Sequence, residues 1–174
     1  MPDIIDSKRR WFLSGRFNTE HGTLRPPWAV AEAGFIERCI RCGDCARACP
    51  EQIIRPGSGR FPEIDFNQGE CTFCAECVDA CKSGALLRSV NDAPWRLAPE
   101  INQRCLAHNR TVCRACGERC EPEAITFRLV YGGIATPRID EQACTGCGAC
   151  QNTCPVNAIM IRPVAGPAYE DRPI

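Results

Sequence analysis

The apolar residues of this 174-residue chain stand in short groups separated by polar residues, prolines and glycines. Four apolar pairs recur along the chain: Ile53 with Ile54, Leu86 with Leu87, Ile125 with Phe127, and Ile159 with Ile161. Groups of this length predict short strands and short helices joined by long loops. We therefore expect an α+β fold in which these pairs form the core.

The N-terminal stretch has a different pattern. Asp6 precedes a basic and apolar run that ends near Gly15, which predicts a short helix with Asp6 as its N-cap. Arg9, Arg10 and Leu13 are similar to a twin-arginine export signal, but polar residues follow where such a signal needs an apolar run. We therefore expect no export by this segment and a cytoplasmic location, where thiols stay reduced.

The composition leaves little material for an ordinary core. Leu, Ile, Val and Phe together make up 35 of 174 residues, or 20%. Disorder would also need a strong net charge, whereas 21 Lys and Arg balance 21 Asp and Glu. The zero net charge argues against nucleic-acid binding, and no apolar run reaches the roughly 18 residues of a membrane span. Cross-links or metal centres are therefore expected to organise the interior.

The 16 cysteines form four groups of four. Three groups follow the spacing Cys-x2-Cys-x2-Cys-x3-Cys, and the third group has seven residues in its first interval. The metal-ligand candidates in chain order are Cys39, Cys42, Cys45, Cys49; Cys71, Cys74, Cys77, Cys81; Cys105, Cys113, Cys116, Cys120; and Cys144, Cys147, Cys150, Cys154. An iron–sulfur cube takes one thiolate at each of its four irons, and closely spaced cysteines can surround an object of that size.

Other interpretations of the cysteines fit less well. Structural zinc prefers two separated cysteine pairs that close on one small ion, and a disulfide framework needs an oxidising compartment. The third group is irregular, because Cys105 must return over a seven-residue loop that also holds His108 as an alternative ligand. Small residues inside the loops are expected to let the backbone approach a cluster. These residues are Gly43, Ala75, Gly117, Gly146 and Gly148.

Several motifs are more specific than the cysteine spacing. They are Ser7-Lys8-Arg9-Arg10 with Leu13 and Gly15-Arg16, the segment Leu24-Arg25-Pro26-Pro27-Trp28, the irregular third group through Glu121-Pro122, and the last group with Gly146, Gly148 and Val156. The repeats resemble bacterial two-cluster ferredoxins over about residues 35–165. The whole chain more specifically resembles the NapF family of ferredoxin-type proteins, which belongs to periplasmic nitrate reductase systems.

This resemblance implies a tandem of bacterial-ferredoxin-like units behind a short helical extension. We expect an N-terminal extension over residues 1–34 and a first unit over 35–90, with repeats at about 30–59 and 62–91. A second unit over 91–174 would hold a degenerate repeat at about 96–128 and a ferredoxin-type repeat at about 135–164. In two-cluster ferredoxins the fourth cysteine of one group ligates the cluster of the other group. The implied ligand sets are Cys39, Cys42, Cys45 with Cys81; Cys71, Cys74, Cys77 with Cys49; Cys105, Cys113, Cys116 with Cys154; and Cys144, Cys147, Cys150 with Cys120.

The resemblance also implies a function. It predicts four [4Fe-4S] clusters, or three if the irregular group does not fill, in a protein that is not itself an enzyme. The expected partner is the catalytic molybdenum subunit of periplasmic nitrate reductase, whose maturation before export the protein would assist. An electron-transfer ferredoxin, or an iron–sulfur subunit of a larger oxidoreductase, is the alternative.

The aromatic and basic residues of the extension allow two interpretations. Trp11, Phe12, Phe17 and Trp28 stand among arginines, so the segment either covers the protein's own core or docks on a partner. In the whole chain 19 of the 21 basic residues are arginine, and several of these flank the first and third cysteine groups. We interpret these arginines as a solvated basic face, although nearby cations would also raise a cluster's potential.

Overall fold

The computed structural model describes residues 23–89, 93–130 and 133–164. The helix expected between Asp6 and Gly15 lies outside these residues, as do the aromatic residues Trp11, Phe12 and Phe17. The elements in chain order are α2 (Glu32–Arg38), α3 (Asp44–Ala48), β1 (Ile54–Pro56), the 3-10 turn η1 (Ser58–Arg60), β2 (Pro62–Ile64), α4 (Glu76–Asp79), β3 (Leu97–Ile101), α5 (Ala115–Glu118), β4 (Ile125–Leu129), β5 (Ala135–Ile139), α6 (Ala149–Asn152) and β6 (Ile159–Pro163). The expected mixture of short helices and short strands is confirmed.

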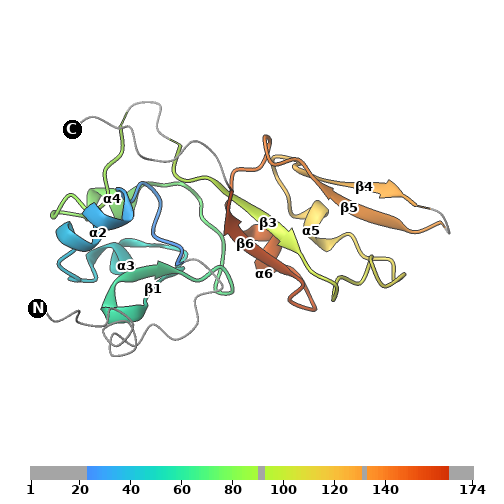
Figure 1. The fold of residues 1–174 in the computed structure, drawn as a ribbon, viewed down its shortest axis with the longest axis horizontal. Coiled ribbons are helices and arrows are strands. Elements are labelled where there is room, and N and C mark those ends of the chain that lie inside the picture. Colours follow the sequence, from blue (N-terminus) through green and yellow to red (C-terminus); the bar gives the residue numbers. More distant parts are fainter. Residues whose placement is uncertain (1–22, 90–92, 131–132, 165–174) are drawn as a thin grey trace, which may run out of the picture.

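The chain forms two halves that lie side by side, with α2 to α4 in one half and β3 to β6 in the other (Figure 1). In the first half β1 pairs antiparallel with β2, and Ala29 forms a bridge with Leu86. In the second half β4 pairs with β5, and β3 pairs with β6. In both halves, therefore, a pair of strands follows the first cysteine group, and the chain before that group pairs with the chain after the second group.

Each of the four cysteine groups places one cysteine in a short helix. Cys45 lies in α3, Cys77 in α4, Cys116 in α5 and Cys150 in α6, and all four are buried. The residue before α3, α4 and α6 has a left-handed backbone, with φ of 78°, 66° and 86°. The residue before α5 has φ of −131° instead, so the group with irregular spacing also enters its helix differently.

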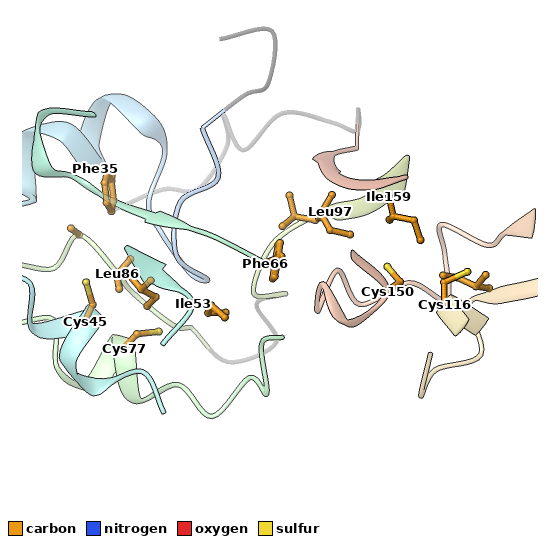
Figure 2. Packing of buried hydrophobic residues seen from close by; sticks show 14 residues of the cluster. Phe35, Cys45, Ile53, Phe66, Cys77, Leu86, Leu97, Cys116, Cys150 and Ile159 are labelled. Atoms are coloured by element: carbon orange, nitrogen blue, oxygen red, sulfur yellow. The ribbon is translucent and has the colours of Figure 1, made fainter. Parts of the chain in front are cut away.

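The core consists of the expected aliphatic residues together with cysteines. The buried members of the expected pairs are Ile53, Ile54, Leu86, Ile125, Ile159 and Ile161, and Phe127 packs against them half-buried. Figure 2 shows Phe66 and Leu97 between the core of the first half and the group of Ile159, Cys150 and Cys116.

The expectation that Leu87 belongs to the core is wrong, since this side chain is 47% exposed. Leu86 is held by the bridge to Ala29, and the Leu87 N–H donates to the carbonyl of Trp28 at 2.9 Å. Consecutive residues of an extended segment point to opposite sides. Leu86 therefore faces inward and Leu87 faces outward.

The described part of the N-terminal extension packs on the protein itself. Trp28 is 3% exposed, and its backbone N–H donates to the carbonyl of Pro94 at 2.7 Å. The Ile64 N–H donates to the carbonyl of Leu24 at 2.8 Å. This described segment therefore covers the protein's own core.

Candidate metal centres

In the first half the thiols gather into two sets that each draw on both cysteine groups. The thiolates whose negative charge raises the pKa of Cys45 are those of Cys81, Cys39 and Cys42. The thiolates whose charge raises the pKa of Cys77 include those of Cys71, Cys49 and Cys74. We call Cys39, Cys42, Cys45 and Cys81 the first quartet, and Cys49, Cys71, Cys74 and Cys77 the second quartet.

The second half repeats this exchange of the fourth cysteine. The charges of Cys105 and Cys113 raise the pKa of Cys116. These three thiols line one cavity together with Cys154. The pKa of Cys150 is raised by the charges of Cys147, Cys144, Cys116 and Cys120. We call Cys105, Cys113, Cys116 and Cys154 the third quartet, and Cys120, Cys144, Cys147 and Cys150 the fourth quartet. The structure thus brings together the four sets of thiols that the sequence resemblance implies.

Burial disfavours the charged thiolate form of these cysteines when no metal is bound to them. It raises the pKa of Cys45, Cys71 and Cys116 to about 11, and that of Cys77 and Cys150 to about 12. Repulsion from neighbouring thiolates contributes to these raised pKa values. Four thiolates can share such a site when positive charge lies between them, which the irons of a cluster supply.

Hydrogen bonds reach the fourth cysteine of two groups. The Leu86 N–H donates to Sγ of Cys81 at 3.4 Å, and the Ala158 N–H donates to Sγ of Cys154 at 3.2 Å. Cys81 also lies 3.6 Å from the hydroxyl of Ser83. Burial raises the pKa of Cys81, but the hydrogen bonds from Ser83, Leu86 and Ala85 outweigh it and leave that pKa lowered. Donors aimed at sulfur are the kind of contact that tunes iron–sulfur centres.

The thiols of the second quartet line one cavity, and those of the third quartet line another. Within the described residues, no three His, Cys, Asp or Glu side chains converge closely enough to hold a single metal ion. The second quartet lines a cavity together with apolar residues such as Ile53 and Ile54. Four thiols around a cavity suit a [4Fe-4S] cube, which offers one iron to each thiolate, better than they suit a zinc ion.

Cys105 reaches the third quartet through a hydrogen-bonded loop. The Asn109 side chain donates to the carbonyls of Cys105, at 2.9 Å, and Gln103, at 2.7 Å. The Asn109 backbone N–H also donates to the carbonyl of Cys105 at 3.0 Å. His108 is exposed, and it is not among the residues that line the cavity beside Cys105. Asn109 is thus a positioning residue that the cysteine spacing does not reveal.

The small residues of the loops act in two ways. Gly43, Ala75, Gly146 and Gly148 all have positive φ, a backbone conformation that turns the chain within the loops. Gly117 does not: it lies inside α5, where an added Cβ would stand 2.6 Å from Cε2 of Phe127. The structure therefore gives Gly117 a packing role, in which its missing side chain lets Phe127 lie against the helix.

Two left-handed residues of the loops are large and were not expected. Arg41 has φ of 59° and Phe73 has φ of 56°, and each stands just before the second cysteine of its group. Gly146 occupies the same position in the last group, with φ of 73°. An alignment of the cysteine groups, which places Arg41 and Phe73 at the position of Gly146, could have indicated the left-handed backbone of both residues.

Comparison with known proteins agrees with this site. Residues 38–85 and 109–158 match the family described as 4Fe-4S dicluster domain. The ferredoxin-type protein NapF of Escherichia coli K12 is 41% identical over 89% of this chain and 94% of its own length. NapF of Haemophilus influenzae is 44% identical over 88% of this chain and 92% of its own length. The chain belongs to the NapF family of ferredoxin-type proteins.

More distant relatives share the ferredoxin-type character. The ferredoxin-type protein NapG of Escherichia coli K12 is 32% identical over 82% of this chain and 71% of its own length. The methylamine utilization ferredoxin-type protein MauM of Methylobacillus flagellatus is 32% identical over 80% of this chain and 67% of its own length. Within the described residues, no helix combines the length and the apolar character that crossing a membrane requires.

Proposed function

We propose that this protein is a cytoplasmic iron–sulfur accessory protein that assists maturation of the catalytic molybdenum subunit of periplasmic nitrate reductase before export. The observation that carries the proposal is the similarity to NapF proteins, at 41–44% identity along about nine tenths of the chain. The four quartets support it, because a protein that handles clusters for another subunit must itself be able to hold them. In this proposal the protein has no catalytic residue.

The roles of the chain's own residues follow from the site. The 16 cysteines would hold four [4Fe-4S] clusters, one in each quartet, and a bound cluster supplies one-electron transfer. The N–H groups of Leu86 and Ala158 stabilise negative charge on two of the sulfurs. Buried Ile53 and Ile159 exclude water beside the cavities of the second and third quartets, which helps to set the potential.

The direct test is an anaerobic pull-down with the unexported catalytic subunit. We expect the iron-loaded protein to capture that subunit, and failure to capture it would contradict the proposal. A truncation then asks whether the N-terminal segment docks. Residues 1–30 carry no cysteine, but Leu24 and Trp28 pack on the protein itself, so the truncation should stop at residue 22.

Removing residues 1–22 is expected to leave the iron content unchanged and to abolish capture. Retained capture would reject docking by this segment, and lost iron would indicate that the segment covers a cluster. Trp28→Ala is the matched control: it removes a ring that is 3% exposed, so it should lower stability without removing residues 1–22.

A plain electron carrier is the second candidate. It is favoured by the similarity to MauM, a ferredoxin-type protein whose name refers to methylamine utilization. In this case the reduced protein would pass electrons to an acceptor enzyme without forming a lasting complex with the immature molybdenum subunit. Nitrate reductase genes beside this gene would favour the first proposal, and genes for another redox enzyme would favour the second.

A further inference from the structure

A largely buried arginine lies in residues 24–28, a segment to which the proposed function gives no role. The Arg25 side chain is 14% exposed, and its Nε and Nη2 donate to the two carboxylate oxygens of Glu32 at 3.0 and 2.7 Å. Its Nη1 donates to the carbonyl of Pro62 at 3.3 Å and lies 3.6 Å from Oε1 of Glu63. The planar guanidinium is therefore fixed between α2 and β2.

The same guanidinium lies over two aromatic rings. Arg25 Cζ is 4.9 Å from the ring centre of Phe35 and 5.5 Å from that of Phe61, and the two ring centres are 6.2 Å apart. Phe35 is fully buried in α2, and Phe61, which directly precedes β2, packs partly buried against the core. Figure 2 shows Phe35 among the core residues of the first half. Because this guanidinium is mostly shielded from water, its attraction to the rings is stronger than at an exposed site.

Both rings are connected to the first cysteine group. The carbonyl of Phe35 accepts a hydrogen bond from the backbone N–H of Cys39 at 2.9 Å. The ring of Phe61 carries a second cation, because Arg41 Cζ lies 5.2 Å from its centre. Arg41 directly precedes Cys42. One ring thus leads to the first cysteine of the group, and the other leads to the residue before the second cysteine.

The position before the second cysteine is one where a side chain needs support from outside its loop. Gly146 occupies it in the last group and has φ of 73° without a steric cost. The first and second groups have Arg41 and Phe73 there instead, with φ of 59° and 56°. Phe73 lies edge-on to Trp95, with ring centroids 5.9 Å apart, and Arg41 lies over Phe61. In both groups, therefore, a ring from outside the group contacts the side chain that this left-handed turn carries.

We propose that Arg25 is a positioning residue for the first quartet. It fixes the two rings, and the rings hold the loop from Cys39 to Cys42, which we call the first ligand loop, in the conformation that presents both thiols to one cluster. Residues 24–28 therefore serve the protein's own first site. The inference rests on the cluster sites of the proposed function, but it does not involve the molybdenum subunit.

The test measures which thiols a cluster protects. The full-length, iron-loaded protein is treated with iodoacetamide under anaerobic conditions, and mass spectrometry gives the labelling rate of each cysteine. A thiolate bound to iron is labelled only when its site opens locally. Arg25→Ala removes hydrogen bonds between charged groups, so we expect the labelling rates of Cys39 and Cys42 to rise about 10- to 100-fold. Cys49 belongs to the same cysteine group but to the second quartet, and its rate should change little.

Two further substitutions separate the rings from the charge. Arg25→Lys keeps a positive charge beside Glu32 but loses the planar, two-pronged contact. Labelling of the first ligand loop should therefore stay raised in this variant, although less than in Arg25→Ala. Phe61→Leu keeps an apolar side chain and removes the ring under both cations, so it should raise the same rates about 2- to 30-fold.

Each kind of substitution has a matched control. Arg55→Ala removes an exposed arginine from β1 in the same half, where its guanidinium donates to Gln68 at 3.2 Å. Phe127→Leu removes a ring in the second half that lies 5.4 Å from Cζ of Arg114. Neither control should raise the labelling rates of the first ligand loop.

The outcomes separate this inference from a merely structural role and from the proposed function. Equal rates in wild type and Arg25→Ala would overturn it. A rate for Cys49 that rises as steeply as those of the first ligand loop would also overturn it, because Arg25 would then stabilise the whole half. Full protection in Arg25→Lys would do the same, since charge alone would be sufficient. Selective labelling of the first ligand loop in Arg25→Ala and Phe61→Leu would support it. Loss of capture in the pull-down, with labelling as expected, would count against the maturation role alone.

Discussion

Replacing Gly148 by alanine tests how closely the two halves fit together. Gly148 has φ of +86°, and a Cβ added there would lie 2.0 Å from Cδ1 of Phe66, a ring that is 2% exposed. A left-handed backbone costs an ordinary L-residue about 1–2 kcal/mol. Overpacking a well-filled core adds typically about 1–3 kcal/mol. We therefore expect Gly148→Ala to destabilise the protein by about 2–5 kcal/mol.

Gly133→Ala is a matched control in the same half. Gly133 has φ of +81°, but a Cβ added there would meet nothing within 4 Å. This variant carries the backbone penalty without the contact, so it should lose about 1–2 kcal/mol. The difference between the two variants isolates the contact with Phe66, at about 1–3 kcal/mol, or about 5- to 150-fold in an unfolding rate if the contact is lost at the barrier.

The assay follows loss of the visible cluster absorbance in guanidinium chloride under anaerobic conditions. Gly148→Ala should bleach faster than Gly133→Ala by that factor. In a background of Phe66→Ala, which removes the obstructing ring, the two glycine substitutions should have similar effects. Equal bleaching rates in the wild-type background, or no relief from Phe66→Ala, would refute the idea that Gly148 is required by the ring of Phe66.

Three further predictions concern the quartets. Anaerobically reconstituted protein should bind about 16 irons, four for each quartet, and a tight zinc complement without iron would contradict this. Cys105→Ala should cost one cluster and leave the other three, as measured by iron content and spectra, while His108→Ala changes neither; the opposite result would make His108 the ligand. Ser83→Ala should lower the reduction potential of the cluster that Cys81 ligates, because it removes a hydrogen bond to the sulfur. A contribution of about 1 kcal/mol corresponds to about 40 mV for one electron, and Ser58→Ala, at an exposed serine, is the control in the redox titration.

The ligand loops were the most predictable part of the molecule. The spacing of the cysteines is local, and the crosswise sets implied by the resemblance reappear as the four quartets of thiols. Aliphatic pairs such as Ile53 and Ile54 were also placed correctly in the core. The cysteine spacing and the aliphatic pairs depend on residues within a few positions of each other, where period and spacing carry the information. The crosswise sets join distant residues such as Cys45 and Cys81, and they came from the resemblance.

The parts that could not be predicted depend on contacts between distant residues. Nothing near Phe66 in the sequence indicates that its ring will meet Trp95, and nothing near Cys71 indicates a bond to Cys147. Leu87 was misplaced because its orientation is decided by the pairing of its neighbour Leu86 with Ala29. Large left-handed residues such as Phe73 contradict their local preference, and the surrounding loop holds them there.

The exchange of the fourth cysteine also bears on how the protein is made. Ribosomes release the N-terminal residues first, and domains generally fold as units while synthesis continues. The first quartet contains Cys39 but also Cys81, and the third contains Cys105 but also Cys154. No complete set of four thiols therefore exists until the nascent chain has emerged beyond residue 77, when Cys77 completes the second quartet. The second half must then wait for Cys150 and Cys154, and pairing of β3 with β6 waits for residues 159–163. The thiol sets of the first half are therefore complete while the second half is still being made, and a pause in translation between them would leave only the first half able to hold iron.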